Sequence, residues 1–256
     1  MLLEAVNRRA QESPHSDTTV TLMQKINKSH YGSLELAVEY GHEDLTKILL
    51  EYNSDRNLLQ GPLILAVKYQ YTEIVKLLLQ YGANPNPCGR IRYSILEFAI
   101  RTKNENIVQI LLDYKADVNI GIHFETPLLC AIACSTGAIV ELLLQNGADP
   151  DYVTAFGVMP LTEAVREGCN KDIVEKLLSL KPDVNFENEY GETPLCMAIK
   201  DKHLEIRDLL LQNGASVNHA DSSGWTLLIH AVQREDDDAV RILLNLNADV
   251  NGKGED

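Results

Sequence analysis

The chain has 256 residues, with 23 lysines and arginines against 37 aspartates and glutamates, so its formal net charge is −14. This balance argues against a general nucleic-acid binder, because affinity for phosphate comes mostly from clustered cations. With 45% hydrophobic residues, the composition excludes global disorder. No apolar run reaches the roughly 18 residues that a membrane-spanning helix needs.

The cysteines and the first residues predict where the protein is found. Five cysteines are scattered without a CxxC pair, which favours reduced thiols over a disulfide framework or a zinc site. Residues 1–17 become polar too early for a secretory signal. We therefore expect a cytoplasmic protein without a bound metal, and a nuclear or host-cell cytosolic location fits the same features.

The first 30 residues contain two short apolar clusters separated by a polar stretch. Leu2, Leu3, Ala5 and Val6 form one cluster, and Val20, Leu22, Met23 and Ile26 form the other. Their spacing predicts two short helices joined by a longer loop. We interpret residues 1–32 as a degenerate version of the units that follow.

From residue 33 onward, one pattern recurs seven times. An alanine followed by a β-branched residue begins at Ala37-Val38 and recurs every 29 to 34 residues until Ala231-Val232. A Leu-Leu pair follows each alanine after twelve or thirteen residues, and an Asn or Asp comes eight residues later. Three landmarks in register across seven units predict an all-α repeat solenoid.

Each unit is expected to be a helix, a short turn, a second helix and an extended loop. In the sixth unit Thr193 can cap the first helix, Pro194 suits its first turn, and Gly214 can end the second helix in the left-handed conformation. The recurring alanine is small because the neighbouring helix approaches closely there. A larger side chain at Ala164 or Ala198 should push adjacent units apart.

The motifs ETPLLCAI at 125–132, ETPLCMAI at 192–199 and GHEDLTKILL at 41–50, with the endings NGADPD and NGASVN, resemble the ankyrin repeat family. The resemblance implies one domain over 1–256, with the leading unit at 1–32, seven repeats over 33–251 and a polar tail at 252–256.

Several residues depart from this pattern, and the glycine that closes the second helix is replaced in four units, by Asn53, Lys115, Lys181 and Asn247. Lys115 and Lys181 replace the glycine that closes the second helix, where a left-handed lysine costs roughly 1 kcal/mol or more. We therefore expect the third and fifth units to be less stable or to end differently. Met159 removes the capping threonine of the fifth unit.

The resemblance implies a non-catalytic scaffold that binds another protein, and the motifs agree. The sequence contains no GxxxxGK[ST] phosphate loop, no HExxH and no GxSxG elbow, and its seven histidines are dispersed. We expect no enzymatic activity, no cofactor and a chain that is monomeric by itself. His230 is expected to be a buried structural residue.

The family's partners usually meet loop residues before the capping threonine and the two residues after the Ala-Val pair. The expected binding residues are Tyr40, Lys68, Tyr69, Arg90, Arg92, Tyr93, Arg101, Tyr190 and Trp225. Binding hot spots favour Trp, Tyr and Arg, although loop aromatics also pack against the next loop. Residues 86–103 carry four cations and one carboxylate, which favours an acidic or phosphorylated partner segment.

Two other functions fit the same sequence. Lys68, Tyr69, Arg90, Tyr93 and Arg101 resemble the cation and aromatic arrangement of ankyrin domains that bind oligonucleotides, which would make the chain a nucleotide or small-molecule sensor. The overall acidity argues against this function. The chain also fits the substrate-recruiting arm of a larger enzyme or of a microbial effector.

The resemblance also implies a modification. Asparagine hydroxylases act on ankyrin asparagines that follow an acidic and apolar pair, with a leucine eight residues upstream. Asn119, Asn185 and Asn251 match this pattern. A local structural role for these loop asparagines is sufficient to explain them without modification.

Overall fold

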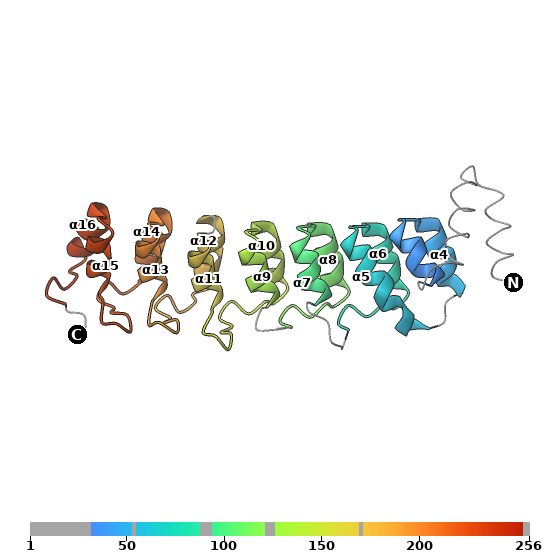
Figure 1. Ribbon diagram of the computed structural model, residues 1–256, viewed down its shortest axis with the longest axis horizontal. Coiled ribbons are helices and arrows are strands. Elements are labelled where there is room, and N and C mark those ends of the chain that lie inside the picture. Colours follow the sequence, from blue (N-terminus) through green and yellow to red (C-terminus); the bar gives the residue numbers. More distant parts are fainter. Residues whose placement is uncertain (1–31, 53–54, 88–93, 121–125, 169–170, 253–256) are drawn as a thin grey trace. The chain divides into compact units, whose positions relative to one another are not determined.

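The computed structural model describes residues 32–52, 55–87, 94–120, 126–168 and 171–252. The chain divides into two compact units, residues 1–117 (unit 1) and residues 118–256 (unit 2). In the described residues of both units the regular elements are helices, apart from an isolated bridge between Ala220 and Thr226. This confirms the predicted all-α repeat architecture (Figure 1).

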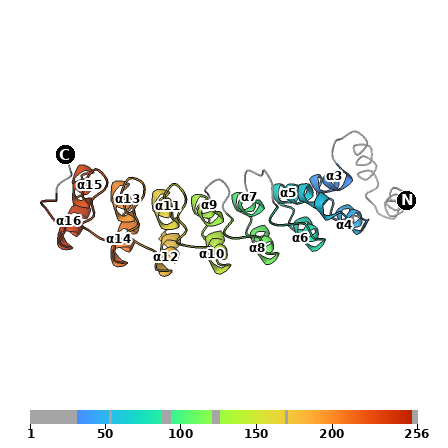
Figure 2. The same cartoon turned by 90° about the horizontal axis from the view of Figure 1, so that it is seen from below.

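The described part of unit 1 contains three helix pairs, called repeats 1 to 3. They are α3 (Ser33–Glu39) with α4 (Glu43–Tyr52), α5 (Gln60–Lys68) with α6 (Thr72–Gln80), and α7 (Ile95–Arg101) with α8 (Glu105–Asp113). A 3-10 helix, η1 (Arg56–Leu59), leads into α5. The first helices α3, α5 and α7 pack in one row and the second helices α4, α6 and α8 in another (Figure 2).

Unit 2 contains four helix pairs in its described residues, called repeats 4 to 7. They are α9 (Pro127–Ala133) with α10 (Gly137–Gln145), α11 (Pro160–Arg166) with α12 (Lys171–Ser179), α13 (Pro194–Lys200) with α14 (Leu204–Gln212), and α15 (Leu227–Gln233) with α16 (Asp237–Asn245). The first helices again contact one another in order, from α9 to α11, α13 and α15.

The recurring alanine lies where adjacent first helices approach most closely. All seven alanines, from Ala37 and Ala66 in unit 1 to Ala198 and Ala231 in unit 2, have no exposed surface. The β-branched residue that follows is also buried in every repeat except repeat 7. Close packing at these positions leaves no room for a larger side chain, as the sequence predicts.

Thr193 caps α13 as predicted; a Ser or Thr side chain also caps α7, α9 and α15, whereas α3 and α5 begin without a side-chain cap. Thr193 accepts a hydrogen bond from the N–H of Cys196, and Ser94 and Glu97 cap α7 reciprocally. Met159 lacks a capping side chain, but the hydroxyl of Thr162 accepts a hydrogen bond from the N–H of Met159 and donates one to its carbonyl. Thr162 thus holds the backbone of Met159 as the third residue of a capping box does, but it does not replace the side-chain acceptor that a threonine at position 159 would provide.

The second helices of repeats 3 and 5 end in the same way as those that carry glycine. Lys115 and Lys181 have φ angles of 67° and 59°, in the left-handed region that Gly147 and Gly214 occupy in repeats 4 and 6. The expectation that these helices end differently is therefore wrong. The rest of each repeat holds the lysine in the left-handed region although lysine disfavours it, and this strain lowers the free energy of unfolding.

Replacing either lysine by glycine should stabilise the protein. We expect Lys115→Gly and Lys181→Gly each to raise the free energy of unfolding by about 0.5–1 kcal/mol, because glycine adopts the left-handed region without steric cost. Urea unfolding at neutral pH measures the change. Lys47→Gly within α4 is the matched control and should lower the free energy of unfolding, since a helical φ gives glycine no advantage there.

Candidate functional site

The predicted binding residues of unit 1 lie at equivalent places in successive repeats. Tyr40 and Tyr69 each follow the last residue of a first helix, α3 and α5 respectively. Their side chains are 44% and 38% exposed. Lys68 and Arg101 are the last residues of α5 and α7 and are also exposed. The structure therefore places these four residues at corresponding ends of neighbouring first helices.

The tyrosines belong to a set of ring contacts at the turn between the two helices of each repeat. Tyr40 stacks on His42 with ring centroids 6.3 Å apart, and Tyr69 lies 5.9 Å from Tyr71. The ammonium of Lys68 is 5.3 Å from the centroid of Tyr69, within the range of a cation–π interaction. These contacts hold the tyrosine rings at the surface while leaving part of each ring open.

Tyr71 links repeats 1 and 2 and was not among the predicted site residues. A Cβ atom on Gly41 would lie 2.9 Å from the Cζ atom of Tyr71, so the ring packs directly on the backbone of Gly41. Gly41 has a φ of 70°, which also favours glycine. Tyr71 therefore supports Tyr69 from within the same turn. A second tyrosine two residues after Tyr69 was the sequence feature that could have indicated this role.

Three predicted binding residues, Arg90, Arg92 and Tyr93, fall in residues 88–93 and lie outside the described residues. Of the other cations in the basic segment 86–103, the structure describes Arg101 and Lys103, and both side chains are exposed.

In unit 2 the predicted residues Tyr190 and Trp225 lie in the loops that precede α13 and α15. Tyr190 is 64% exposed, and a hydrogen bond to Glu189 raises the pKa of its hydroxyl. The carbonyl of Tyr190 accepts a hydrogen bond from the N–H of Ser222 at 3.0 Å, which ties the loops of repeats 6 and 7 together. Trp225 is 36% exposed, and its ring lies 5.6 Å from the ring of His230.

Asp221 holds the loop that carries Trp225. Its Oδ1 atom accepts hydrogen bonds from the N–H groups of Ser223 and Trp225, and its Oδ2 atom lies 2.8 Å from Nε2 of His230. Burial opposes ionisation of Asp221, but these hydrogen bonds outweigh it and lower the pKa of the carboxyl below its ordinary value. Buried His230 is thus a structural residue, as expected.

Two cations of the first helices of unit 2 form ion pairs with neighbouring carboxylates. Arg166 lies 2.6 Å from Glu163 and 2.8 Å from Glu167, and Lys200 pairs with Glu192. The hydrogen bonds that Arg166 donates to Glu163 raise the pKa of Arg166. These cations are already neutralised by neighbouring carboxylates and are poor candidates for binding an acidic partner.

Charge is distributed very unequally between the two units. Unit 1 has 13 lysines and arginines against 14 aspartates and glutamates, a net charge of −1. Unit 2 has 10 against 23, a net charge of −13. Nearly all of the excess negative charge therefore belongs to unit 2.

Two of the three asparagines predicted as hydroxylation sites, Asn119 and Asn185, form hydrogen bonds between successive loops. Asn119 accepts from the N–H of Asp149 at 2.9 Å and donates to the carbonyl of Gly147, and Asn185 accepts from the N–H of Ser216 at 2.8 Å. Asn86 and Asn218 bridge their neighbouring loops in the same way. Asn251 is exposed, and its N–H donates to Asp249 within its own loop.

Asp151 stands at the corresponding position of repeat 4 and accepts no such hydrogen bond from repeat 5 in the described loops. Asp151→Asn should restore the bridge and raise the free energy of unfolding by about 1 kcal/mol. Thermal and urea unfolding measure this change. The reverse substitution, Asn119→Asp, should lower the free energy of unfolding, because the donor to Gly147 is lost. Equal stability of both variants and the wild type would contradict the structural role of the bridge.

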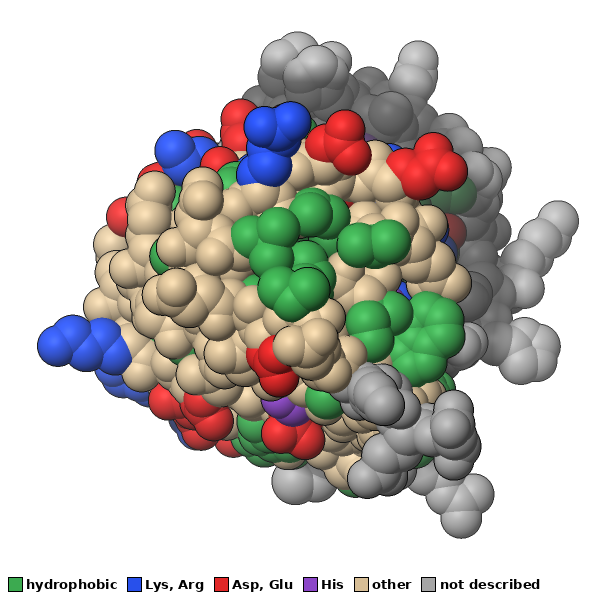
Figure 3. Space-filling view, turned by 90° about the vertical axis from the view of Figure 1, so that its left-hand side faces the viewer, with side chains coloured by type: hydrophobic (Ala, Val, Ile, Leu, Met, Phe, Trp, Pro, Cys, Tyr) green, Lys and Arg blue, Asp and Glu red, His purple; other side chains and the backbone are tan. Residues whose placement is uncertain are grey.

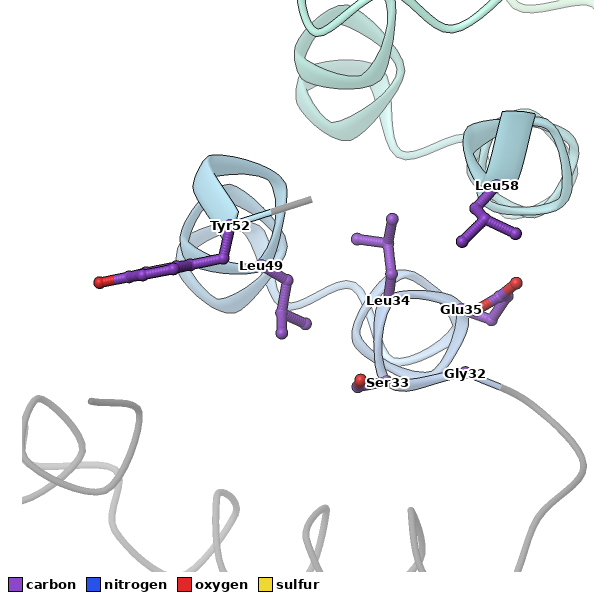
Figure 4. Close-up of a pocket in the computed structure, with 7 residues that line it drawn as sticks. All are labelled: Gly32, Ser33, Leu34, Glu35, Leu49, Tyr52 and Leu58. Atoms are coloured by element: carbon purple, nitrogen blue, oxygen red, sulfur yellow. The ribbon is translucent and has the colours of Figure 1, made fainter. Parts of the chain in front are cut away.

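The described residues also offer two shallow pockets. One in unit 1, of about 430 Å³, is lined by Gly32, Ser33, Leu34, Glu35, Leu49, Tyr52 and Leu58. Leu34 and Leu58 point toward one another across it (Figure 4). The other, of about 370 Å³, lies on repeat 7 and includes Trp225. Neither lining contains a cation that would bind a phosphate.

Nothing among the described residues forms a reactive or metal-binding cluster. No group of three or more His, Cys, Asp or Glu side chains is placed to hold a metal ion in this part of the chain. Burial, with Glu192 nearby, raises the pKa of the Cys196 thiol to about 12, so this thiol stays protonated. The described helices are also too short and too polar for any of them to cross a bilayer.

Comparison with known proteins identifies the repeats. A family model described as ankyrin repeats (3 copies) matches residues 34–122, 63–154 and 161–253, and one described as ankyrin repeats (many copies) matches residues 138–178. The putative ankyrin repeat protein YahD of Escherichia coli (strain K12) is 31% identical over 169 residues, which cover 64% of this chain and 84% of that protein.

Two longer relatives match part of the chain. The ANK repeat-containing protein nipk-1 of Caenorhabditis elegans is 34% identical over 167 residues, which cover 59% of this chain and 26% of that protein. The transient receptor potential cation channel subfamily A member 1 of Homo sapiens is 28% identical over 146 residues, which cover 53% of this chain and 13% of the channel. The matched family models cover most of the sequence, and the chain therefore belongs to the ankyrin repeat family.

Proposed function

We propose that the chain is a non-catalytic module that binds a partner protein on the surface formed by its loops and the ends of its first helices. The observation that carries this proposal is a set of partly exposed aromatic residues at two kinds of repeat position: Tyr40 and Tyr69 at the ends of first helices in unit 1, and Tyr190 and Trp225 in the loops before first helices in unit 2. Each ring is held by a neighbouring group, so little conformational entropy is lost when a partner covers it.

In unit 1 the proposed partner segment is acidic or phosphorylated. Lys68 and Arg101 lie at the ends of adjacent first helices, and the Lys68 ammonium lies over Tyr69. Cations in this arrangement pair with carboxylates or phosphates, while the tyrosine provides apolar contact area. Unit 1 has a net charge of only −1, so its cations act without strong opposition from the rest of that unit.

A pull-down from lysate, read by mass spectrometry, tests this function. The wild-type chain is compared with a Tyr69→Ala, Arg101→Glu variant of unit 1 and a Tyr190→Ala, Trp225→Ala variant of unit 2, each shown to unfold at the wild-type temperature. Partners lost with one variant assign the surface to that unit. If both variants retained every partner, the loops and first helices would not be the binding surface.

The second candidate function is a nucleotide sensor, which the Lys68 and Tyr69 arrangement favours. A thermal-shift screen discriminates it, since a ligand at 100 times its dissociation constant stabilises the folded state by about 2.7 kcal/mol. No shift with any nucleotide would exclude this alternative.

A role as the recruiting arm of a larger enzyme or effector uses the same binding surface and would show the same loss of partners in the variants.

Hydroxylation of the loop asparagines is proposed in a definite order. Asn119 and Asn185 use their amide oxygens in bridges to the next repeat, whereas Asn251 is exposed and bridges no other described loop. An asparagine hydroxylase that needs the loop to open should therefore modify Asn251 first. Mass spectrometry after exposure to such an enzyme should show oxygen addition at Asn251 before Asn119 or Asn185. Faster modification of Asn119 would contradict the order.

A further inference from the structure

Repeat 7 exposes a β-branched residue that is buried in the other repeats of unit 2. The β-branched residue after the recurring alanine is 0% exposed at Ile132 and Val165 and 1% exposed at Ile199, but 60% exposed at Val232. In the preceding repeats the next first helix covers this position, as α11 contacts α9, α13 contacts α11 and α15 contacts α13. Leu244 and Val250 of repeat 7 are exposed as well.

Val232 and Val250 line a pocket of repeat 7, and Leu244 is a further exposed apolar residue of the same repeat. The pocket, of about 370 Å³, is lined by Trp225, Leu228, Ile229, Val232, Val250 and Asp249, among others. We call these six residues, together with Leu244, the repeat 7 end face. Figure 3 shows this end of unit 2, where apolar side chains gather in the middle and acidic side chains lie near the edge.

Trp225 gives the repeat 7 end face a rigid anchor. Its backbone N–H is bound by Asp221, and its ring lies against buried His230. A partly exposed tryptophan that is already held in place loses little entropy when a partner covers it, which is typical of binding hot spots.

The charge around the repeat 7 end face selects the partner. Residues 226–252 contain Arg234 and Arg241 against five carboxylates, a net charge of −3 within a unit of −13. Four of these carboxylates are consecutive, Glu235 to Asp238, and the fifth is Asp249 in the pocket lining. A second copy of the chain would bring the same negative charge to the contact, whereas a cationic segment complements it.

We propose that the repeat 7 end face binds an amphipathic helix of another protein, with a narrow stripe of small and branched apolar residues flanked by Lys and Arg. A helix is favoured because first helices that carry an alanine and a β-branched residue, such as α13 with Ala198 and Ile199, pack on the preceding first helix throughout unit 2, and the flanking cations follow from the negative charge around this face. This surface is separate from the loop and first-helix residues of unit 1 proposed above to bind an acidic segment.

Three designed 20-residue helical peptides test the proposal by fluorescence anisotropy. The first has an Ala, Leu and Val stripe with Lys at its polar positions, the second has the same stripe with Glu in place of Lys, and the third is a scrambled Lys peptide without a stripe. We expect the first to bind at least tenfold more tightly than either of the others. Val232→Asp should weaken its binding at least tenfold.

Leu204→Asp is the matched control, because Leu204 is another exposed apolar residue of unit 2 and begins α14. It adds the same charge and should leave binding of the first peptide unchanged, as should Tyr69→Ala in unit 1. Equal binding of the Lys peptide to Val232→Asp and wild type would overturn the proposal. So would equal binding of the scrambled peptide, or sedimentation showing a wild-type dimer that Val232→Asp converts to a monomer.

Discussion

Ala198→Leu should lower the free energy of unfolding of the protein by about 3 kcal/mol, the largest effect that we expect from a single substitution in unit 2. Ala198 has no exposed surface and lies in α13, which contacts both α11 and α15. A leucine there adds three carbon atoms to a closely packed contact, so the helices must separate or the side chain must leave its preferred rotamer. Urea unfolding followed by circular dichroism measures the loss.

The control for this prediction is Ala138→Leu. Ala138 lies in α10 of the same unit, but its side chain is exposed. The same substitution there should change the free energy of unfolding by less than about 0.5 kcal/mol, since alanine and leucine are both good helix formers. Similar destabilisation at both positions would contradict the explanation that close helix approach selects alanine.

Asp221→Ala should lower the free energy of unfolding by about 2–3 kcal/mol at neutral pH. The substitution leaves buried His230 without its carboxylate partner and removes the acceptor for the N–H groups of Ser223 and Trp225. Asp221→Asn keeps an acceptor for the two backbone groups and should lose less. The near-ultraviolet signal of Trp225, the only tryptophan of the chain, reports the loosening of its loop.

The effect of Asp221 should depend on pH. The hydrogen bonds lower the pKa of Asp221 below 3.8 in the folded state. Its stabilising contribution is therefore complete above the unfolded pKa and is lost as the pH falls through the folded pKa. The difference in stability between wild type and Asp221→Ala should be constant near neutral pH and shrink below about pH 4. Exposed Asp238 provides the control, because Asp238→Asn removes a carboxylate that makes no hydrogen bond in the described structure.

The helix pairs and their core could be predicted from the sequence because the repeat supplies seven versions of the same evidence. The alanine, the leucine pair and the loop asparagine each stand at a position with one packing role, and the burial of all seven alanines confirms that role. The exposed side chains of Tyr40, Tyr69, Tyr190 and Trp225 also followed from repeat position alone.

Contacts between repeats could not be predicted in the same way. Tyr71 packs on Gly41, thirty residues earlier, and the N–H of Ser222 donates to the carbonyl of Tyr190 in the preceding loop. Such contacts depend on how two repeats stack, and they involve residues that differ from one repeat to the next. The positive φ angles of Lys115 and Lys181 could not be predicted for a similar reason. Lysine by itself disfavours the left-handed conformation, which the packing of the repeat imposes on it.

The loop bridges also set how far unfolding spreads along unit 2. In a linear array, stability is the sum of the intrinsic terms of single repeats and the coupling between nearest neighbours. The asparagine bridges add to the coupling between repeats 5 and 6 and between repeats 6 and 7. With Asp151 in place of an asparagine, the junction between repeats 4 and 5 is held by helix packing and by the exposed ion pair of Glu141 and Lys176. An exposed ion pair contributes little. Repeat 4 should therefore exchange its amide hydrogens before repeats 5 to 7, which open together as one cooperative block.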